Sequence, residues 1–365
     1  MINTQNQKAG DHSQQFQATQ MVVNVGIDEK RAREIYQEMN LQLRKDYSDE
    51  AISVALSRVS EFESKLMPKM EKVEGALEVF ADPSFQLLLV EAQKTAASTE
   101  RPADYDLLSE LLVHRFQAGE NRIIRAGINR AVEIVDEVSD DALLGLTIFH
   151  AVLHLSPNTT NIFEGLDVLD RLFQKLFYCD LPSGHEWVDH LEILNAVRIN
   201  NLVQLSKIEQ IYSNSLSEYI NPGIAKDSDN FIQAKTIIQE NNLPPQLLVE
   251  HALNKDFMRL NIFKKDLNTL CVIENHGTPY SKSTPFSEGQ KHAIEQIYQL
   301  YNQDPEQKQK NCEALMNEWD KRPSLQKLKT WWDNLNVSFT TTSVGRVLAH
   351  SNIQRCDNTI PNLET

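Results

Sequence analysis

The sequence has little glycine and proline, with 12 and 13 of these residues among 365. They gather at a few places, whereas a β-sandwich needs turn residues at intervals of roughly ten residues. This scarcity disfavours an all-β fold and predicts a mainly α protein, a multi-helix bundle of helical hairpins with one short N-terminal β-strand element. The length and the 41% of hydrophobic residues are sufficient for two or three domains with a sizeable core.

Cysteine is also scarce. The four cysteines, Cys179, Cys271, Cys312 and Cys356, lie far apart and form no C-x-x-C pair. Together with the absence of a signal-peptide pattern, this predicts a cytoplasmic protein with reduced thiols. No apolar run approaches the ~20 residues that a membrane span needs, so no membrane insertion is expected.

Basic residues are fewer than acidic ones, 36 against 51, so the formal net charge is −15. Such a field repels polyphosphates, so bulk nucleic-acid binding is not expected. The chain contains no P-loop, no G-x-G-x-x-G after a strand and no G-x-S-x-G elbow. Nucleotide binding and serine hydrolysis therefore have no support, no cofactor is predicted and no catalytic residue is assigned.

The N-terminal segment carries a strand-like alternation instead. Its apolar positions fall in two registers, Phe16 and Ala18 in the first and Met21, Val23, Val25 and Ile27 in the second. Two hypotheses remain open for this segment. It is either a disordered glutamine-rich tail or a pair of short strands, which is marginal in water alone and invites pairing with another chain.

Helical periodicity takes over from Asp28. Between Ile52 and Phe80, apolar residues recur at alternating steps of four and three, with Leu66 and Val73 on the seam. This heptad pattern predicts a coiled-coil-like helix whose packing partner lies in the same chain or in another. Pro68 is expected to kink or split that helix.

Loops at several points divide the rest of the chain. The segment from Asn221 to Asp229 has little apolar content and is predicted to be a joint. We expect four units: a β-rich oligomerisation element at 1–27, long coiled-coil-like helices at 28–97, a helical core domain at 98–222 and a C-terminal helical domain at 223–365. Helices are predicted at 186–200 and 245–254, among others.

The C-terminal part holds two further features. Trp331 and Trp332 are adjacent on a predicted helix, and we expect at least one of them in the core and the other at a contact surface. Thr342 or Ser343 is expected to cap a last helix, in which Gly345 has no local reason to occur except close packing.

Histidines suggest the one candidate metal site. His150 and His154 stand four residues apart, and "HEWVDH" adds His185, Asp189 and His190. However, the first pair lacks the glutamate of H-E-x-x-H, and His185 and His190 are spaced so that they point to different helix faces. The alternative, that these histidines are buried and hydrogen-bonded, is favoured, and no metal is predicted.

One resemblance adds a biological setting. The stretch "QKAGDHSQQFQA" (7–18) resembles an N-terminal element of the form G-D-x-S, followed by a glutamine-rich strand, that precedes varied domains in bacterial conflict proteins. "DLLSELLVHRF", "RAVEIVDEVSDDALLGLTIFHAV", "DHLEILNAVRI" and "FTTTSVGRVLAHSNI" are similar in order to one poorly characterised bacterial family of that kind. The resemblance implies defence against phage and supplies no catalytic residues.

The oligomerisation residues follow from these patterns. Gly10 and Asp11 would make the turn of the N-terminal strands, whose apolar face would pair with another chain. The predicted oligomerisation residues, including two from the heptad seam, are Gly10, Asp11, Phe16, Ala18, Val23, Val25, Leu66 and Val73. The leading hypothesis is a non-enzymatic, self-associating sensor or scaffold of anti-phage defence, with phage or host proteins as further candidate partners. The alternatives are a metal-dependent hydrolase or nuclease effector using His150, His154 and His190, and a general cytosolic adaptor.

Overall fold

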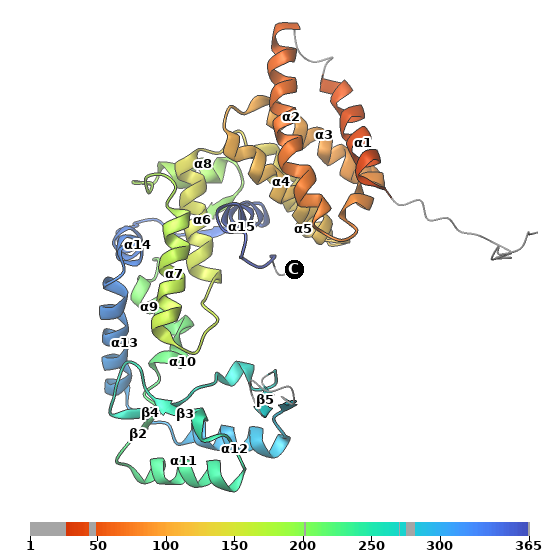
Figure 1. The fold of residues 1–365 in the computed structure, drawn as a ribbon. Coiled ribbons are helices and arrows are strands. Elements are labelled where there is room, and N and C mark those ends of the chain that lie inside the picture. Colours follow the sequence, from red (N-terminus) through yellow and green to blue (C-terminus); the bar gives the residue numbers. More distant parts are fainter. Residues whose placement is uncertain (1–26, 44–48, 201, 270, 275–281, 364–365) are drawn as a thin grey trace, which may run out of the picture.

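The computed structural model describes residues 27–43, 49–200, 202–269, 271–274 and 282–363. The fold is mainly α, as the sequence predicts (Figure 1). Gly10, Asp11, Phe16, Ala18, Val23 and Val25 lie outside the described residues, so the predicted N-terminal strands and their pairing stay a prediction.

The first helices form the end of the molecule that carries the N-terminus. They are α1 (Glu29–Leu43), α2 (Asp49–Glu71), the 3-10 helix η1 (Ala76–Ala81), α3 (Pro83–Ser98), α4 (Pro102–Gln117) and α5 (Arg122–Ile134). Local chemistry sets several of their ends. The Asp82 carboxylate accepts hydrogen bonds from the backbone N–H groups of Ser84 and Phe85, and Pro83 occupies the first helical position of α3.

Between Ile52 and Phe80 the chain is not one continuous helix: α2 ends at Glu71, three residues after Pro68, the residue expected to kink or split it. Pro68 removes one backbone hydrogen bond in the last turn, and Gly75 then adopts a left-handed conformation with φ 76° before η1 begins. Leu66 is fully buried and Val73 half-buried in the chain's own core, where α2 packs on α3 and α4. The partner of the heptad seam is therefore in the same chain.

Next come the central helices α6 (Asp140–His154), α7 (Ile162–Leu176), α8 (Glu186–Ile193), α9 (Ile208–Ser215) and α10 (Ser217–Ile220). The predicted helix at 186–200 is wrong beyond Ile193. Asn195 has a positive φ of 59°, and the chain continues as strand β1 (Val197–Ile199). This strand pairs antiparallel with β7 (Phe339–Thr341), with Val197 opposite Thr341. The pairing joins the segment before the last helix to the middle of the sequence.

A smaller unit follows α10. It contains β2 (Ile224–Ala225), α11 (Asp229–Glu240), η2 (Pro245–Leu247), β3 (Leu248–Glu250), β4 (Phe257–Leu260), η3 (Lys264–Asp266), β5 (Cys271–Glu274), β6 (Lys282–Pro285) and α12 (Glu288–Gln299). The predicted helix at 245–254 is wrong, since Leu248–Glu250 pairs with β4 in a sheet of order β2-β4-β3. A separate hairpin joins β5 to β6.

The last helices return to the first part of the chain. They are α13 (Pro305–Asp320), α14 (Pro323–Asp333) and α15 (Ser343–Cys356), and α15 packs against α4, α5 and α6 (Figure 1). Buried apolar side chains accordingly form two clusters. The first runs from Ala32 to Ile220, includes Phe263 and resumes between Leu315 and Ile353, whereas the second lies between Ile224 and Tyr301.

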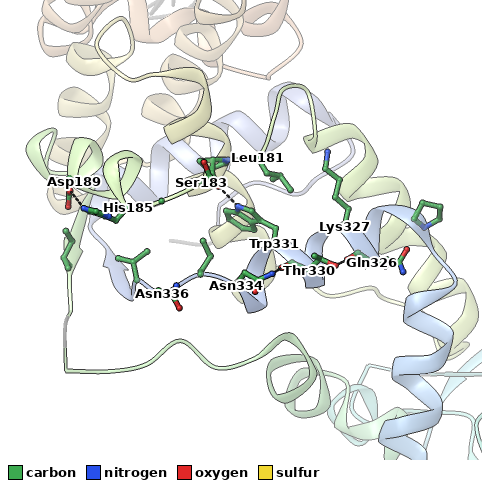
Figure 2. A pocket seen from close by; sticks show the side chains of 16 residues that line it. Leu181, Ser183, His185, Asp189, Gln326, Lys327, Thr330, Trp331, Asn334 and Asn336 are labelled. Atoms are coloured by element: carbon green, nitrogen blue, oxygen red, sulfur yellow. Dashed lines mark hydrogen bonds and ion pairs between the residues drawn. The ribbon is translucent and has the colours of Figure 1, made fainter.

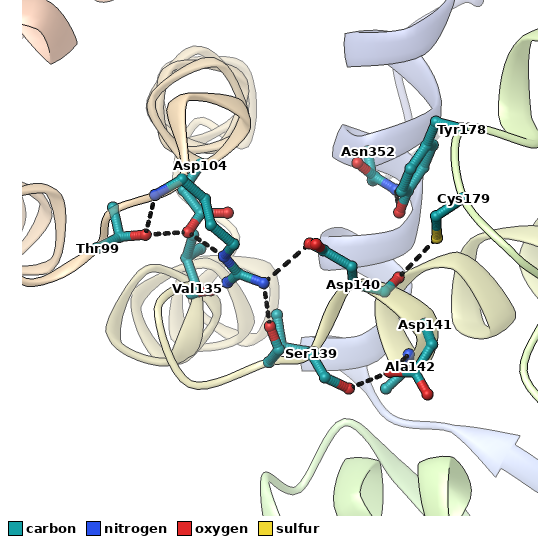
Figure 3. Close-up of polar contacts among 12 residues, drawn as sticks. Thr99, Asp104, Val135, Ser139, Asp140, Asp141, Ala142, Tyr178, Cys179 and Asn352 are labelled. Carbon is teal, nitrogen blue, oxygen red and sulfur yellow. Dashed lines mark hydrogen bonds and ion pairs between the residues drawn. The ribbon is translucent and has the colours of Figure 1, made fainter.

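Arg101, just before α4, joins α4, α5 and α6. Figure 3 labels its partners Asp104, Val135 and Asp140. The Arg101 guanidinium donates to the carbonyl oxygens of Val135 and Val138 at 2.8 and 2.7 Å and to the carboxylates of Asp104 and Asp140 at 3.0 Å each. Burial raises the pKa of Asp104, while Thr99 and Arg101 oppose that rise. This network satisfies the carbonyl groups at the C-terminal end of α5 and fixes the turn into α6.

Candidate functional site

An open groove of about 930 Å³ runs along α14 (Figure 2). One side is formed by residues 181–189 and the other by α14 and the segment 334–337 that follows it. Half-buried or buried apolar side chains line its floor: Leu181, Pro182, Ile199, Trp331, Leu335 and Val337. Exposed polar side chains surround them: Ser183, His185, Asp189, Gln326, Lys327, Thr330, Asn334 and Asn336.

The two adjacent tryptophans of α14 divide between core and groove. Trp332 is 1% exposed, stacks on Phe149 at 5.4 Å between ring centroids and donates its indole N–H to the carbonyl of Ser206. Trp331 lies in the groove, and its indole N–H donates to the carbonyl of Pro182 at 2.7 Å. This bond ties the two walls together, which keeps the groove preformed.

A second cavity of about 370 Å³ adjoins the groove, because Leu335, Asn336 and Val337 line both. Beside it the Asn200 N–H donates to the carbonyl of Ser338 at 2.8 Å, which extends the pairing of β1 with β7 by one residue. Val203, which also lines this cavity, is an exposed apolar residue. The face around α14 therefore combines apolar surface with hydrogen-bonding groups and a few charged side chains, among them Asp189 and Lys327, as protein-binding surfaces do.

The histidines of the predicted metal site lie in separate parts of the structure. His150 is buried, with its Nε2 3.4 Å from Nδ1 of His350 and its ring 4.6 Å from that of His154. His190 accepts a hydrogen bond from the Ser139 N–H at the start of α6, about 16 Å along the helix from His150. His185 lines the groove near Asp189, at 3.7 Å. The structure does not bring His150, His154 and His190 together.

The sequence did not reveal the actual neighbours of His150. The ring of His350, on α15, also lies 5.7 Å from the ring of His114, measured between centroids. Nδ1 of His114 forms a hydrogen bond with the hydroxyl of Ser351. Burial, with neighbouring positive charge, lowers the pKa of His114 to about 4 and that of His150 to about 3. Within the described ranges, no group of three or more histidine, cysteine or acidic side chains could hold a metal ion.

Comparison with known proteins places the chain in a family. A protein-family model whose description reads only ":-like" matches residues 26–364. The chain belongs to this family. The match begins after almost all of the predicted N-terminal element, so the family pattern covers the helical body and the small α/β unit. No curated protein and no solved structure is significantly similar to the chain. In the part of the chain that the structure describes, no helix combines the length and apolar character that crossing a bilayer requires.

Proposed function

We propose that this protein is a non-enzymatic, self-associating sensor or scaffold of bacterial anti-phage defence in the cytoplasm, and that the α14 groove receives residues 13–27 of a second copy. The observation that carries the proposal is the groove itself, preformed and open, with an apolar floor and a rim rich in carboxamide and hydroxyl groups. The resemblance of residues 7–18 to the N-terminal element of bacterial conflict proteins supports the setting.

The chemistry of the two surfaces is matched. Residues 13–27 contain no charged side chain; Phe16 and Ala18 flank Gln17, and Val23 and Val25 flank Asn24, whereas Met21, Val22 and Val23 are consecutive. An extended strand places alternate side chains on opposite faces, so Met21, Val23, Val25 and Ile27 can meet the floor while Asn24 faces the rim. Phe16 and Ala18 would need the change of register between the two runs to reach the same floor. Because each chain has a net charge of −15, contact through an uncharged segment also limits repulsion between copies.

Thr330 allows a test that leaves the core unchanged. It is exposed in the groove, and its hydroxyl donates to the carbonyl of Gln326, four residues earlier. Thr236 on α11 is equally exposed and bonds the carbonyl of Ile232 in the same way, outside the groove. We expect Thr330→Arg to reduce the mass of the assembly in sedimentation velocity, because a charged side chain would occupy the groove, and Thr236→Arg to leave that mass unchanged.

Deletion of residues 1–26 should reduce the assembly as strongly as Thr330→Arg while the helical circular dichroism signal remains. A synthetic peptide of residues 13–27 should then bind the deleted protein and fail to bind its Thr330→Arg form. Unchanged mass in both variants would refute self-association through the groove. In a phage-plaquing assay, loss of protection with either variant would support the defence role, and retained protection despite loss of assembly would refute the link.

A further inference from the structure

Arg259 on β4 is a buried cation without an anionic partner. The residue is 5% exposed, and its Nε donates to the carbonyl of Leu260 at 3.2 Å. Among the described residues no carboxylate forms an ion pair with it, and its two Nη groups have no hydrogen-bond partner. The guanidinium instead lies over the rings of Tyr219 and Phe263, 5.5 and 5.6 Å from their centroids.

A guanidinium that is mostly buried loses part of its hydration without gaining an opposite charge, while its Nη groups, which are not among the fully buried polar atoms without a partner, keep contact with the cavity. The two aromatic rings offset part of that loss and hold the planar group in one orientation. Its free N–H groups are arranged as a fork that fits a carboxylate or another oxyanion. The arrangement is therefore typical of a site that is completed by an anionic ligand.

Arg259 lines a cavity of about 260 Å³ at the joint between the two hydrophobic clusters. Tyr219 and Phe263 belong to the first cluster, whereas Leu260 and Tyr301 belong to the second. Clefts between packed units are frequent places for small-molecule sites. The Tyr301 hydroxyl, which also lines the cavity, accepts from the Leu260 N–H at 2.7 Å, so its own proton remains available to a ligand.

A carboxylate lines the same cavity. Glu218 on α10 accepts a hydrogen bond from the Lys264 N–H at 3.2 Å, and it forms no ion pair with Arg259. Burial raises the pKa of Glu218, while Lys265 and Arg259 oppose that rise. Glu218 and Arg259 thus face one small cavity without an ion pair between them, and the exposed Lys264 adds a second positive charge to its lining. A purely anionic ligand would meet the negative charge of Glu218, whereas a ligand with both charges would satisfy both walls.

We propose that this cavity binds a small zwitterion of the α-amino-acid class, with its carboxylate on Arg259 and its ammonium group on Glu218. The ligand would join the main helical body to the small α/β unit, since its two charges contact residues on α10 and β4. This inference concerns a different cavity from the α14 groove and does not rest on the self-association proposed above.

The test uses the full-length protein and the twenty common L-amino acids, each added singly, with acetate and ethylammonium as probes that carry one charge only. Binding is measured by the rise in melting temperature and then by isothermal titration calorimetry. We expect at least one amino acid to bind and acetate and ethylammonium to bind at least tenfold more weakly. Arg259→Met should weaken the amino acid at least tenfold, and Glu218→Gln should weaken it while keeping the hydrogen bond from Lys264.

Arg355→Met is the matched control, because Arg355 also lies over a tyrosine ring, that of Tyr178 at 5.0 Å, but outside this cavity. It should leave binding unchanged. Absence of binding by every amino acid would overturn the proposal, as would equal affinity for acetate, which would indicate an adventitious anion only. If Arg259→Met fails to fold, Glu218→Gln provides the test. Undiminished binding of the amino acid by Glu218→Gln would show that Glu218 does not hold the ammonium group, which would overturn the proposal. The mass of the assembly is recorded in parallel. A failure of the amino-acid site can then be distinguished from a failure of self-association through the α14 groove.

Discussion

Gly345 in α15 lies against the backbone of Ala196, so closely that a Cβ atom on Gly345 would overlap the Ala196 carbonyl oxygen and stand 2.9 Å from its carbonyl carbon. The same oxygen accepts hydrogen bonds from the N–H and hydroxyl of Thr342 at 3.0 Å each. Thr342 also caps α15 by accepting from the Gly345 N–H at 3.2 Å. The start of the last helix is thereby fixed on the segment before β1, and the close packing expected at Gly345 is present.

We predict that Gly345→Ala lowers the free energy of unfolding by about 1–3 kcal/mol, because the backbone of Ala196 cannot yield as a side chain would. Gly289 in α12 is the control, since a Cβ there would meet only the Ser287 hydroxyl at 3.9 Å. Gly289→Ala should be neutral or stabilising by up to about 1 kcal/mol. Urea titration of both variants measures the difference, and equal stability would show that α15 can shift away from Ala196.

Leu66 tests whether the heptad seam acts within one chain. Leu66→Ala removes buried methyl groups and should cost about 2–5 kcal/mol of folding stability, without changing the sedimentation mass of the protein that remains folded. Val54, on the same helix but 51% exposed, provides the comparison. Val54→Ala should change stability by less than about 0.5 kcal/mol. A drop in assembly mass with Leu66→Ala would show instead that the seam contributes to contacts between chains.

Arg101 is predicted to matter far more than an ordinary surface arginine. Arg101→Met leaves the buried Asp104 carboxylate without its partner and frees two carbonyl groups of the α5–α6 turn, so we expect a loss of about 3–5 kcal/mol. Arg130 pairs with Glu133 at 2.8 Å, but both side chains are more than one-third exposed. Arg130→Met should therefore cost no more than about 1 kcal/mol. Thermal melts would contradict this contrast if the two losses were similar.

The buried histidines predict a defined pH dependence. His114 and His150 have pKa values lowered to about 4 and about 3 from an ordinary value of 6.5, so the unfolded chain binds protons at a higher pH than the folded one. Their contribution to stability is complete above about pH 6.5 and is lost as the pH falls towards 4, at up to about 1.4 kcal/mol per pH unit for each histidine. Arg346 and His154 near His150 act in the same direction.

Replacing His150 with Phe should flatten this profile in part, because one of the buried histidines with a lowered pKa no longer titrates, while others such as His114 and His251 remain. His185→Phe is the control, since that side chain is 75% exposed in the groove wall. Its stability profile should match that of the unchanged protein between pH 7 and pH 4. Denaturant unfolding at several pH values provides the measurement. A slope that does not respond to His150→Phe would indicate that carboxylates rather than these histidines govern acid unfolding.

Local sequence patterns predicted many of the helices and several of their ends, although the α-helix predicted at 245–254 is absent and the one at 186–200 ends at Ile193. Apolar periodicity and end signals such as Thr342 reflect interactions over three or four residues, so they can be read without knowing the fold. The mainly α class, the cap of α15 and the close contact of Gly345 followed from such local chemistry. The expectation that at least one of the two adjacent tryptophans lies in the core is confirmed, and the structure shows that it is Trp332.

Which helices and strands pack against one another depends on the tertiary structure. Periodicity shows that the face carrying Leu66 is apolar, but not that α3 and α4 cover it. Val197 becomes a strand because Thr341, distant in the sequence, offers its backbone as a partner, and His150 finds His350 for the same reason. The groove and the unpaired Arg259 depend on such long-range contacts, since a cavity is formed by side chains from several elements and no single stretch of sequence encodes it.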